Sequence, residues 1–324
     1  MNQVFWNVTS EGSPHAIILG MSGQGKSRTL MKILHQFAEK ANFLAIDFHG
    51  DISEDLKGST RVVDVKVDGL PFNPFEPPSR DQDSITQFCL DMADIFQSVC
   101  GLGAMQRVQV YKALVGSFES AEYSSNESAI PPTMSDFVSQ LTFIEEQNKK
   151  VNSSARLLSV TEFQIFKANT DKDLDNLSTS VVLNLSNLLS ENLKVICASL
   201  MLRKLYSSMQ HRGKRESIDF GVFVDEAHLL TKDPTISKLF KESRKFGISA
   251  ILASQSLSDF HPNVLDNTGL KVAFRLNNPT SVSAARFLGG PDNKNVVSHI
   301  ENLAVGDCLV AIPTQEKLIR VKVF

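Results

Sequence analysis

The sequence has few cysteines, and their spacing indicates neither a metal site nor a disulfide framework. Cys89, Cys100, Cys197 and Cys308 are scattered, with no C-x-x-C pair and no neighbouring histidines. A protein of a reducing cytoplasm is therefore expected.

Long apolar runs and an excess of one charge are also missing. No apolar run approaches the roughly 18 residues of a transmembrane helix, and the start lacks a charged-then-apolar leader, so neither a membrane span nor secretion is expected. The chain carries 33 Lys and Arg against 36 Asp and Glu, a net charge of −3. A uniformly basic, histone-like surface is thereby excluded, and any contact with nucleic acid must be local, in a groove or ring channel.

The most informative segment that is present is G-M-S-G-Q-G-K-S at 20–27, which matches the phosphate-loop pattern G-x-x-x-x-G-K-[ST]. An apolar run at 16–19 precedes it, and 28–40 has apolar residues at helical spacing. A chance match in a surface turn would lack this strand and helix, so we predict an ATP site at the start of a helix. The residues expected to bind the nucleotide are Gly20, Ser22, Gly23, Gln24, Gly25, Lys26, Ser27 and Arg28.

A second apolar run at 221–224 leads into Asp225 and Glu226 and is typical of a Walker B strand. Mg²⁺ would then be held by the Ser27 hydroxyl and Asp225, and Glu226 would polarise the water that attacks the γ-phosphate. A core strand that merely ends in two acids is the alternative, and the phosphate loop in the same chain makes it much less favoured.

The rest of the chain predicts an α/β fold with a mainly parallel central sheet, because apolar strand-like runs alternate with helical segments. We expect one domain over 1–324, with a mostly helical insertion at about 84–167 and a terminal hairpin at 307–312 and 318–323. A Pro-rich turn at 70–78 cannot be a helix interior. Further strands are expected at 43–46, 61–65, 181–185, 248–253 and 270–275, and a helix at 191–209.

Six segments in order resemble the HerA/FtsK superfamily of ring-forming, DNA-pumping ATPases: G-M-S-G-Q-G-K-S, I-D-F-H-G-D, L-P-F-N-P-F, V-F-V-D-E-A-H, S-R-K-F-G-I and I-L-A-S-Q-S-L. The resemblance spans nearly the whole chain and implies a RecA-like P-loop NTPase fold. By this resemblance Glu226 is the water-activating residue, Gln255 the sensor and Arg244 an arginine that reaches the neighbouring subunit's γ-phosphate.

Several residues keep two interpretations. Arg244 could instead be a solvated charge beside Lys241 and Lys245. His49 is more readily a hydrogen-bonded structural residue than a base, and Arg275 could be a sensor or a structural partner. The role of Asp47 is open.

The resemblance implies an ATP-driven motor on double-stranded DNA that forms a homo-oligomeric, hexameric ring. Proteins of the HerA type usually carry an N-terminal β-barrel, yet only about fifteen residues precede the loop strand. This departure suggests a minimal form or the ATPase part of a longer protein, such as those of bacterial defence systems that include phosphorothioation-dependent restriction. A regulatory ATPase switch that licenses a partner nuclease is the alternative. A nucleotide kinase is disfavoured, because lid arginines and an acceptor site have no visible counterpart.

Overall fold

The computed structural model describes residues 6–8, 12–147, 151–163, 165–166, 176–231, 233–258, 260–289 and 294–324. Contacts divide the chain into two compact units. The first unit contains Met1–Val62, Asn176–Leu183 and Ser208–Phe324, and the second contains Val63–Asp175 and Asn184–Ser207.

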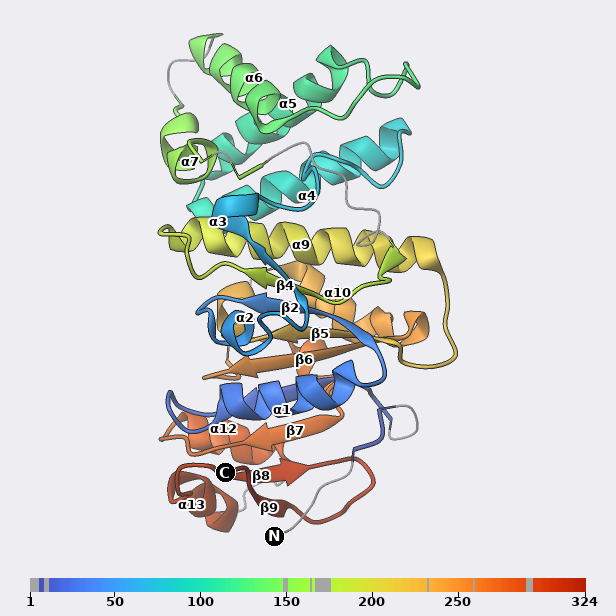
Figure 1. Ribbon diagram of the computed structural model, residues 1–324. Coiled ribbons are helices and arrows are strands. Elements are labelled where there is room, and N and C mark those ends of the chain that lie inside the picture. Colours follow the sequence, from blue (N-terminus) through green and yellow to red (C-terminus); the bar gives the residue numbers. More distant parts are fainter. Residues whose placement is uncertain are drawn as a thin grey trace. The chain divides into compact units, whose positions relative to one another are not determined.

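A nine-stranded sheet has the order β3-β4-β2-β5-β6-β1-β7-β8-β9 (Figure 1). The pairs β2–β5, β5–β6, β6–β1 and β1–β7 are parallel, whereas β7–β8 and β8–β9 are antiparallel. The predicted α/β fold with a mainly parallel sheet and a terminal hairpin is confirmed. The strands are β1 (Ala16–Leu19), β2 (Asn42–Asp47), β3 (Arg61–Asp64), β4 (Val181–Asn184), β5 (Phe220–Val224), β6 (Ile248–Ser254), β7 (Leu270–Ala273), β8 (Asp307–Ala311) and β9 (Ile319–Lys322).

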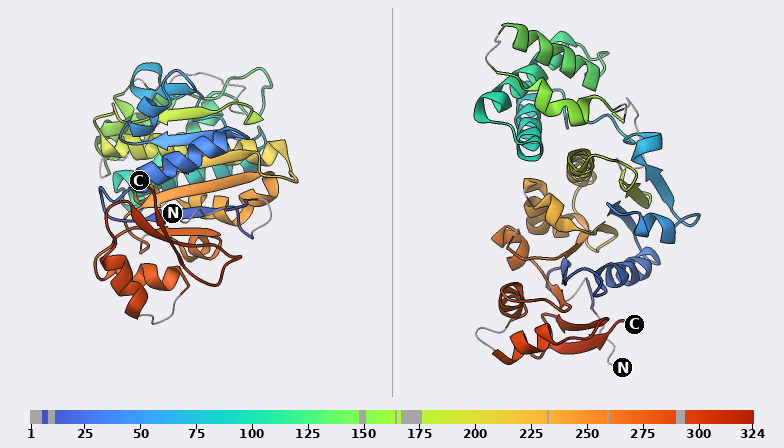
Figure 2. Two further views of the ribbon diagram at one scale, coloured as in Figure 1. Left: turned by 60° about the horizontal axis from the view of Figure 1, so that its bottom comes forward. Right: turned by 90° about the vertical axis from the view of Figure 1, so that its left-hand side faces the viewer.

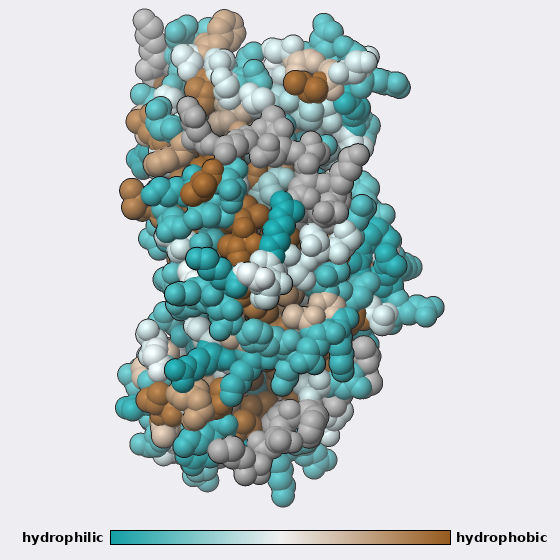
Figure 3. Space-filling view, in the orientation of Figure 1, coloured by the Kyte–Doolittle hydropathy of each residue, from teal (hydrophilic) through white to brown (hydrophobic). Residues whose placement is uncertain are grey.

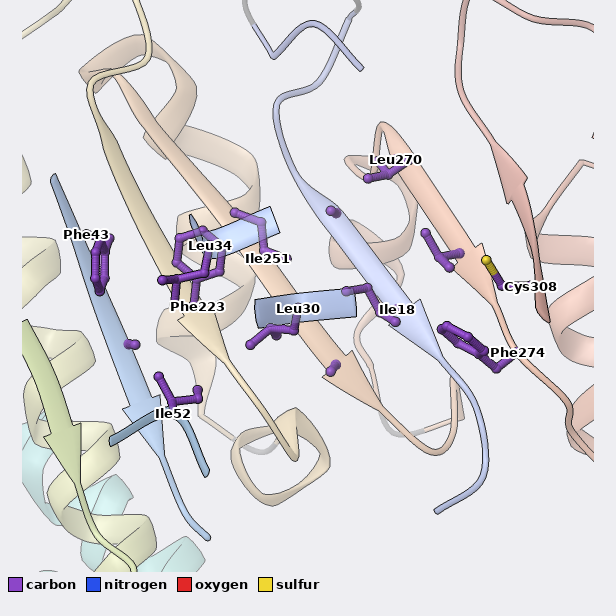
Figure 4. Packing of buried hydrophobic residues seen from close by; sticks show 14 of the residues in the cluster. Ile18, Leu30, Leu34, Phe43, Ile52, Phe223, Ile251, Leu270, Phe274 and Cys308 are labelled. Atoms are coloured by element: carbon purple, nitrogen blue, oxygen red, sulfur yellow. The ribbon is translucent and has the colours of Figure 1, made fainter. Parts of the chain in front are cut away.

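The central strands are buried along their whole length, which explains their continuous apolar runs. Every residue of β1, β5 and β6 is buried, as expected of parallel strands covered on both faces. Helix α1 (Lys26–Ala38) lies on one face and α10 (Pro234–Glu242) on the other (Figure 2). Leu30 and Leu34 of α1 pack over the strands against Phe223 and Ile251 (Figure 4). This packing fixes α1, and with it the phosphate loop, to the sheet.

Several boundaries differ from those predicted, among them three near the phosphate loop and the sheet ends. Helix α1 begins at Lys26 rather than at residue 28. The strand expected at 61–65 ends at Asp64, because the Asp64 carboxylate accepts a hydrogen bond from the Lys66 backbone N–H at 3.0 Å and starts the short helix α3 (Val65–Asp68). Strand β7 ends at Ala273, so Arg275 lies beyond the strand.

Several short elements have no counterpart among the elements predicted from the sequence. Among the described residues of the first unit they are α2 (Asp51–Asp55), η1 (Ala227–Leu230), α10, η2 (Ser243–Phe246), α11 (Pro262–Asp266), α12 (Thr280–Phe287) and α13 (Lys294–Glu301). Local signals for α10 exist, because the Asp233 carboxylate accepts from the Thr235 N–H at 2.8 Å and Pro234 occupies the first helical position.

The second unit has its own aromatic core. Four helices pack in sequence, α4 (Gln82–Cys100), α5 (Ala104–Ser120), α6 (Met134–Gln147) and α7 (Ser154–Thr161). The rings of Phe96 and Phe137 stack with centroids 5.6 Å apart, and Phe75 of the Pro-rich turn lies 6.0 Å from Phe137. Residues 148–150, 164 and 167 of the expected helical insertion lie outside the described residues.

The long helix α9 (Glu191–Arg212) extends the predicted 191–209 segment by one turn. On the face drawn in Figure 3, hydrophobic side chains occur in small groups among hydrophilic ones. Across the residues that are described, no helix is long and apolar enough to cross a membrane.

Candidate nucleotide-binding site

The loop between β1 and α1 requires glycine at two positions. A Cβ atom on Gly20 would lie 2.7 Å from the Cβ atom of Phe274. Gly25, the residue before α1, has a φ of +120°, and a Cβ there would lie 2.8 Å from Phe324 Cε1 and 3.1 Å from Phe274 Cε1. The backbone can take this path only without side chains at these points, which fits a loop whose N–H groups surround an anion.

Lys26 begins α1, and its side chain is held at the loop. The residue is only 5% exposed, and its Nζ donates a hydrogen bond to the Met21 carbonyl at 3.2 Å. Burial lowers the pKa of the Lys26 ammonium, while the negative charges of Glu226 and Asp225 act in the opposite direction. The ammonium thus lies in a desolvated position where a bound phosphate would be strongly attracted.

Ser27 and Asp225 meet although they are almost two hundred residues apart in the sequence. The Ser27 hydroxyl interacts with the Asp225 carboxylate and lowers the pKa of that carboxylate. Burial raises the pKa of Asp225, and the bonds from Ser27 and from the Glu226 backbone N–H, the latter at 2.9 Å, oppose this shift. A hydroxyl and a carboxylate are hard oxygen ligands that suit Mg²⁺. These two residues therefore fit a magnesium site beside the loop.

Glu226 lies at the centre of a polar cluster. Its backbone is left-handed, with a φ of 53°, and its side chain is 14% exposed. Gln255 Nε2 donates to Glu226 Oε2 at 3.3 Å, His228 Nδ1 lies 3.1 Å from the same oxygen, and His49 Nε2 lies 3.9 Å from Oε1. Gln255 thus orients the carboxylate by a hydrogen bond, whereas the His228 Nδ1 atom lies near it without making one. The three side chains follow β2, β5 and β6, at the sheet edge where ligands of open α/β folds bind.

Asp47, whose role the sequence left open, makes structural hydrogen bonds to the turn that follows it. The residue is 1% exposed. Its Oδ1 accepts from the Gly50 N–H at 2.8 Å, and its Oδ2 accepts from the Ser53 N–H at 2.7 Å and the Ser53 hydroxyl at 2.6 Å. Asp47 therefore fixes the turn that places His49 beside Glu226. The His49 ring itself is mostly exposed.

Arg244 was predicted as a site residue, but the structure does not bring it to this cluster. It is exposed on η2, and the seven residues of β6 separate it from Gln255. At about 3.3 Å per residue, this strand spans about 23 Å. The Arg244 charge instead contributes to lowering the pKa of His15, which burial and this charge together bring to about 3. Arg244 thus lies at the amino end of the strands and cannot reach the phosphate loop of its own chain.

Arg275 is exposed just past β7. Its carbonyl accepts from the Met21 N–H at 3.1 Å, so its backbone supports the phosphate loop.

Two features of the site were not predicted from the sequence. His228 stands two residues after Glu226 in the D-E-A-H segment, and that proximity was the available signal. Phe324 lies near the loop through a hairpin almost 300 residues away in the chain. The Arg28 guanidinium carbon is 4.4 Å from the centroid of its ring, and no local pattern indicates this contact.

We refer to Asp225, Glu226, His228 and Gln255 as the acidic flank of the phosphate loop, and to Arg28, Phe274 and Phe324 as the aromatic flank. A phosphate loop on a parallel sheet, with an acidic strand end bonded to the loop serine, defines a P-loop ATPase. The chain matches the family described as the central domain of the HerA helicase over residues 7–205. It belongs to that family and is a P-loop ATPase of the HerA/FtsK type.

Individual relatives agree with this assignment. The chain is 24% identical over 338 residues to the DNA double-strand break repair helicase HerA of Sulfolobus acidocaldarius, covering 95% of this chain and 62% of the relative. It is 25% identical over 313 residues to the corresponding protein of Sulfurisphaera tokodaii, covering 91% of this chain and 62% of the relative. The chain thus spans about three fifths of the length of these relatives.

Solved structures share the fold at low sequence identity. VirB4 of Thermoanaerobacter pseudethanolicus superposes with a TM-score of 0.77 at 18% identity, covering 99% of this chain and 93% of VirB4. The plasmid coupling protein TrwB, in complex with ADP and Mg²⁺, gives a TM-score of 0.69 at 12% identity, covering 96% of this chain and 85% of TrwB. These likenesses support the RecA-like P-loop fold.

Proposed function

We propose that this chain hydrolyses ATP to ADP and phosphate and uses the energy to move double-stranded DNA. The observation that carries the proposal is the acidic flank, because Glu226 is half-buried, accepts a hydrogen bond from Gln255, lies near His228, and is adjacent to the Ser27–Asp225 pair. A carboxylate fixed beside a phosphate site suits activation of water rather than transfer to a second substrate. Ser27 and Asp225 would hold Mg²⁺, which when bound neutralises charge on the β- and γ-phosphates.

The proposed chemistry divides the work among residues of this chain. Lys26 would bind the β/γ oxygens with its buried ammonium, and residues 22–25 would donate backbone N–H groups to the phosphates, because the Gly20 and Met21 N–H groups already donate to backbone carbonyls. Glu226 would orient and polarise the attacking water, with its carboxylate held by Gln255. Gln255 would thus sense the γ-phosphate through its bond to Glu226.

DNA as the substrate rests on family membership and on relatives that are named DNA repair helicases. We extend the proposal to a hexameric ring in the cytoplasm that serves DNA processing or bacterial defence, alongside a partner nuclease. The test is ATP turnover with and without duplex DNA, combined with displacement of a protein roadblock from that DNA. Stimulation together with displacement supports a motor. Turnover without displacement, and with activation of a co-expressed nuclease, would instead support the regulatory switch.

Assembly can be tested through Arg244. Because Arg244 is remote from the loop of its own chain, it can act on ATP only across a subunit boundary. Arg244→Ala should then reduce turnover by about 10³- to 10⁵-fold, the range of arginine fingers supplied in trans. Mixing the Arg244→Ala and Lys26→Ala chains should restore activity at interfaces that pair an intact loop with an intact finger. If the two chains co-assemble without recovery, Arg244 is a solvated surface charge.

A further inference from the structure

The aromatic flank presents an aromatic ring and a guanidinium beside the phosphate loop. Phe324 is 42% exposed, and its ring lies against Arg28 of α1 at 4.4 Å. It also lies so close to Gly25 that a Cβ there would come within 2.8 Å of Cε1. A flat, partly exposed hydrophobic surface therefore borders the phosphate site directly.

The sheet order determines which part of a nucleotide would meet this surface. Asp225 and Glu226 follow β5, which lies two strands from β1 on one side, whereas β7, β8 and β9 lie on the other side. A bound nucleoside triphosphate is elongated, and its γ-phosphate must face the acidic flank for hydrolysis. Its base must therefore lie away from β5, on the side of the loop where the β8–β9 hairpin carries Phe324.

Backbone hydrogen bonds hold the hairpin against the loop. The Gly306 N–H donates to the Gln24 carbonyl at 3.1 Å, and the Val323 N–H donates to the Gly306 carbonyl at 2.7 Å. Lys32 of α1 donates from Nζ to the Val323 carbonyl at 2.5 Å. The ring is thus fixed before a ligand binds, which lowers the entropy cost of binding.

A polar group at the same junction also lacks a partner. Gln24 Oε1 is buried and accepts no hydrogen bond among the described residues. A buried acceptor without a donor is costly, and a ligand that brings an amino or hydroxyl group would satisfy it. The ribose hydroxyls, which ATP and GTP share, are such donors.

We propose that Phe324 and Arg28 form the platform on which the purine base of ATP stacks. This inference rests on the proposed function, because it assigns the base end of the same nucleotide site. Stacking uses the π face that all purines share and reads no edge of the base. Binding should therefore distinguish adenine from guanine only weakly. The platform should contribute equally to the affinities for ATP and GTP.

The test compares ligands with and without a base on the full chain. Dissociation constants of Mg²⁺-ATP, Mg²⁺-GTP and Mg²⁺-tripolyphosphate are measured for the wild type, Phe324→Ala and Phe324→Trp. Phe324→Ala should weaken ATP and GTP binding about 5- to 100-fold, which corresponds to the roughly 1–3 kcal/mol of one base–aromatic stack. It should leave tripolyphosphate affinity unchanged, and Phe324→Trp should retain nucleotide affinity. The control is Phe143→Ala, which removes an exposed phenylalanine from α6.

The outcomes separate this inference from the proposed function. Lys26→Ala should weaken all three ligands, and failure to do so would contradict the phosphate site itself. An equal loss of ATP and tripolyphosphate affinity in Phe324→Ala would mean that the ring only supports the loop, and the base platform would be wrong. Unchanged ATP affinity in a folded Phe324→Ala chain would overturn it as well.

Discussion

The two flanks of the phosphate loop are built in opposite ways. On the acidic flank, side chains from separate strand ends contact one another through polar atoms around Glu226. On the aromatic flank, contacts are between rings, glycine backbone and a guanidinium. One flank holds charge in a defined orientation for a reaction, and the other provides shape that a ligand can pack against.

This difference teaches how each flank responds to mutation. Polar groups that orient a carboxylate affect the rate of reaction, because charge placement in a desolvated site controls the transition state. Contacts of rings with the loop affect affinity and stability, because they act in the ground state as much as in the transition state. Substitutions on the two flanks should therefore separate turnover from binding.

Among substitutions on the two flanks, the largest effect is expected for Glu226→Gln, which keeps the shape of the acidic flank but removes its base. Turnover should fall about 10²- to 10⁴-fold, the usual contribution of a positioned general base, while ATP affinity is retained. The measurements are steady-state phosphate release and equilibrium ATP binding. Glu216→Gln, at an exposed position before β5, should change neither. If the Glu226→Gln variant retained turnover but lost ATP binding, the assignment of Glu226 to water activation rather than to ATP binding would be wrong.

Lys26→Ala tests the loop between the two flanks. A hydrogen bond to a charged group is worth about 1.5–3 kcal/mol, so ATP affinity should fall at least about 10- to 100-fold. Calorimetric titration of ATP into the variant measures this directly. The matched control is Lys40→Ala, which removes an exposed ammonium just after α1. Wild-type ATP affinity in the Lys26→Ala variant would contradict the assignment of the phosphate loop as the ATP site.

The acidic flank was largely predictable from the sequence, because each of its parts is local. An apolar run followed by Asp225 and Glu226 indicates a buried strand end, and carboxyl ends of parallel strands meet at one edge. The phosphate loop likewise carries its own pattern between a strand and a helix. Gln255 was placed by the resemblance of the following strand to the family, and the structure brings it to Glu226.

The aromatic flank and the location of Arg244 could not be predicted in this way. Phe324 reaches Arg28 through an antiparallel hairpin, and no spacing in the sequence indicates which segment such a hairpin will cover. Arg244 resembles a family position, but only the direction and length of β6 show that it is remote from its own loop. The role of Asp47 stayed open in the sequence, and the structure shows that its carboxylate oxygens accept hydrogen bonds from the turn that follows.

The aromatic flank can be tested for stability by comparing two glycines of the loop. An alanine at Gly25 would meet Phe324 and Phe274 at 2.8 and 3.1 Å and must adopt a φ of +120°, whereas one at Gly23 would have nothing within 4 Å at a φ of +74°. Gly23→Ala should cost about 1–2 kcal/mol from its left-handed backbone, and Gly25→Ala about 1–3 kcal/mol more because of strain and contact. Denaturant unfolding of both variants measures the difference. Equal losses would mean that the rings move away freely and that the flank is not rigid.

The smallest loss of kcat is expected on replacing either of the two histidines beside Glu226. The comparison shows which of them positions the carboxylate. His228 Nδ1 lies 3.1 Å from Glu226 Oε2, while His49 Nε2 lies 3.9 Å from Oε1 on a side chain that is 61% exposed. Ion pairs exposed to solvent contribute about 0–1 kcal/mol, so His49→Ala should lower kcat by no more than about fivefold. His228 is closer and less exposed, so His228→Ala should lower kcat by more than His49→Ala does, with KM for ATP little changed in both. Steady-state kinetics of the two alanine variants measure this difference in kcat. His228→Asn, which keeps a donor near the carboxylate, should recover part of the rate. If the His49 variant is the slower one, Glu226 is oriented mainly from β2, and the distances in the ground state do not identify the residue that positions it for reaction.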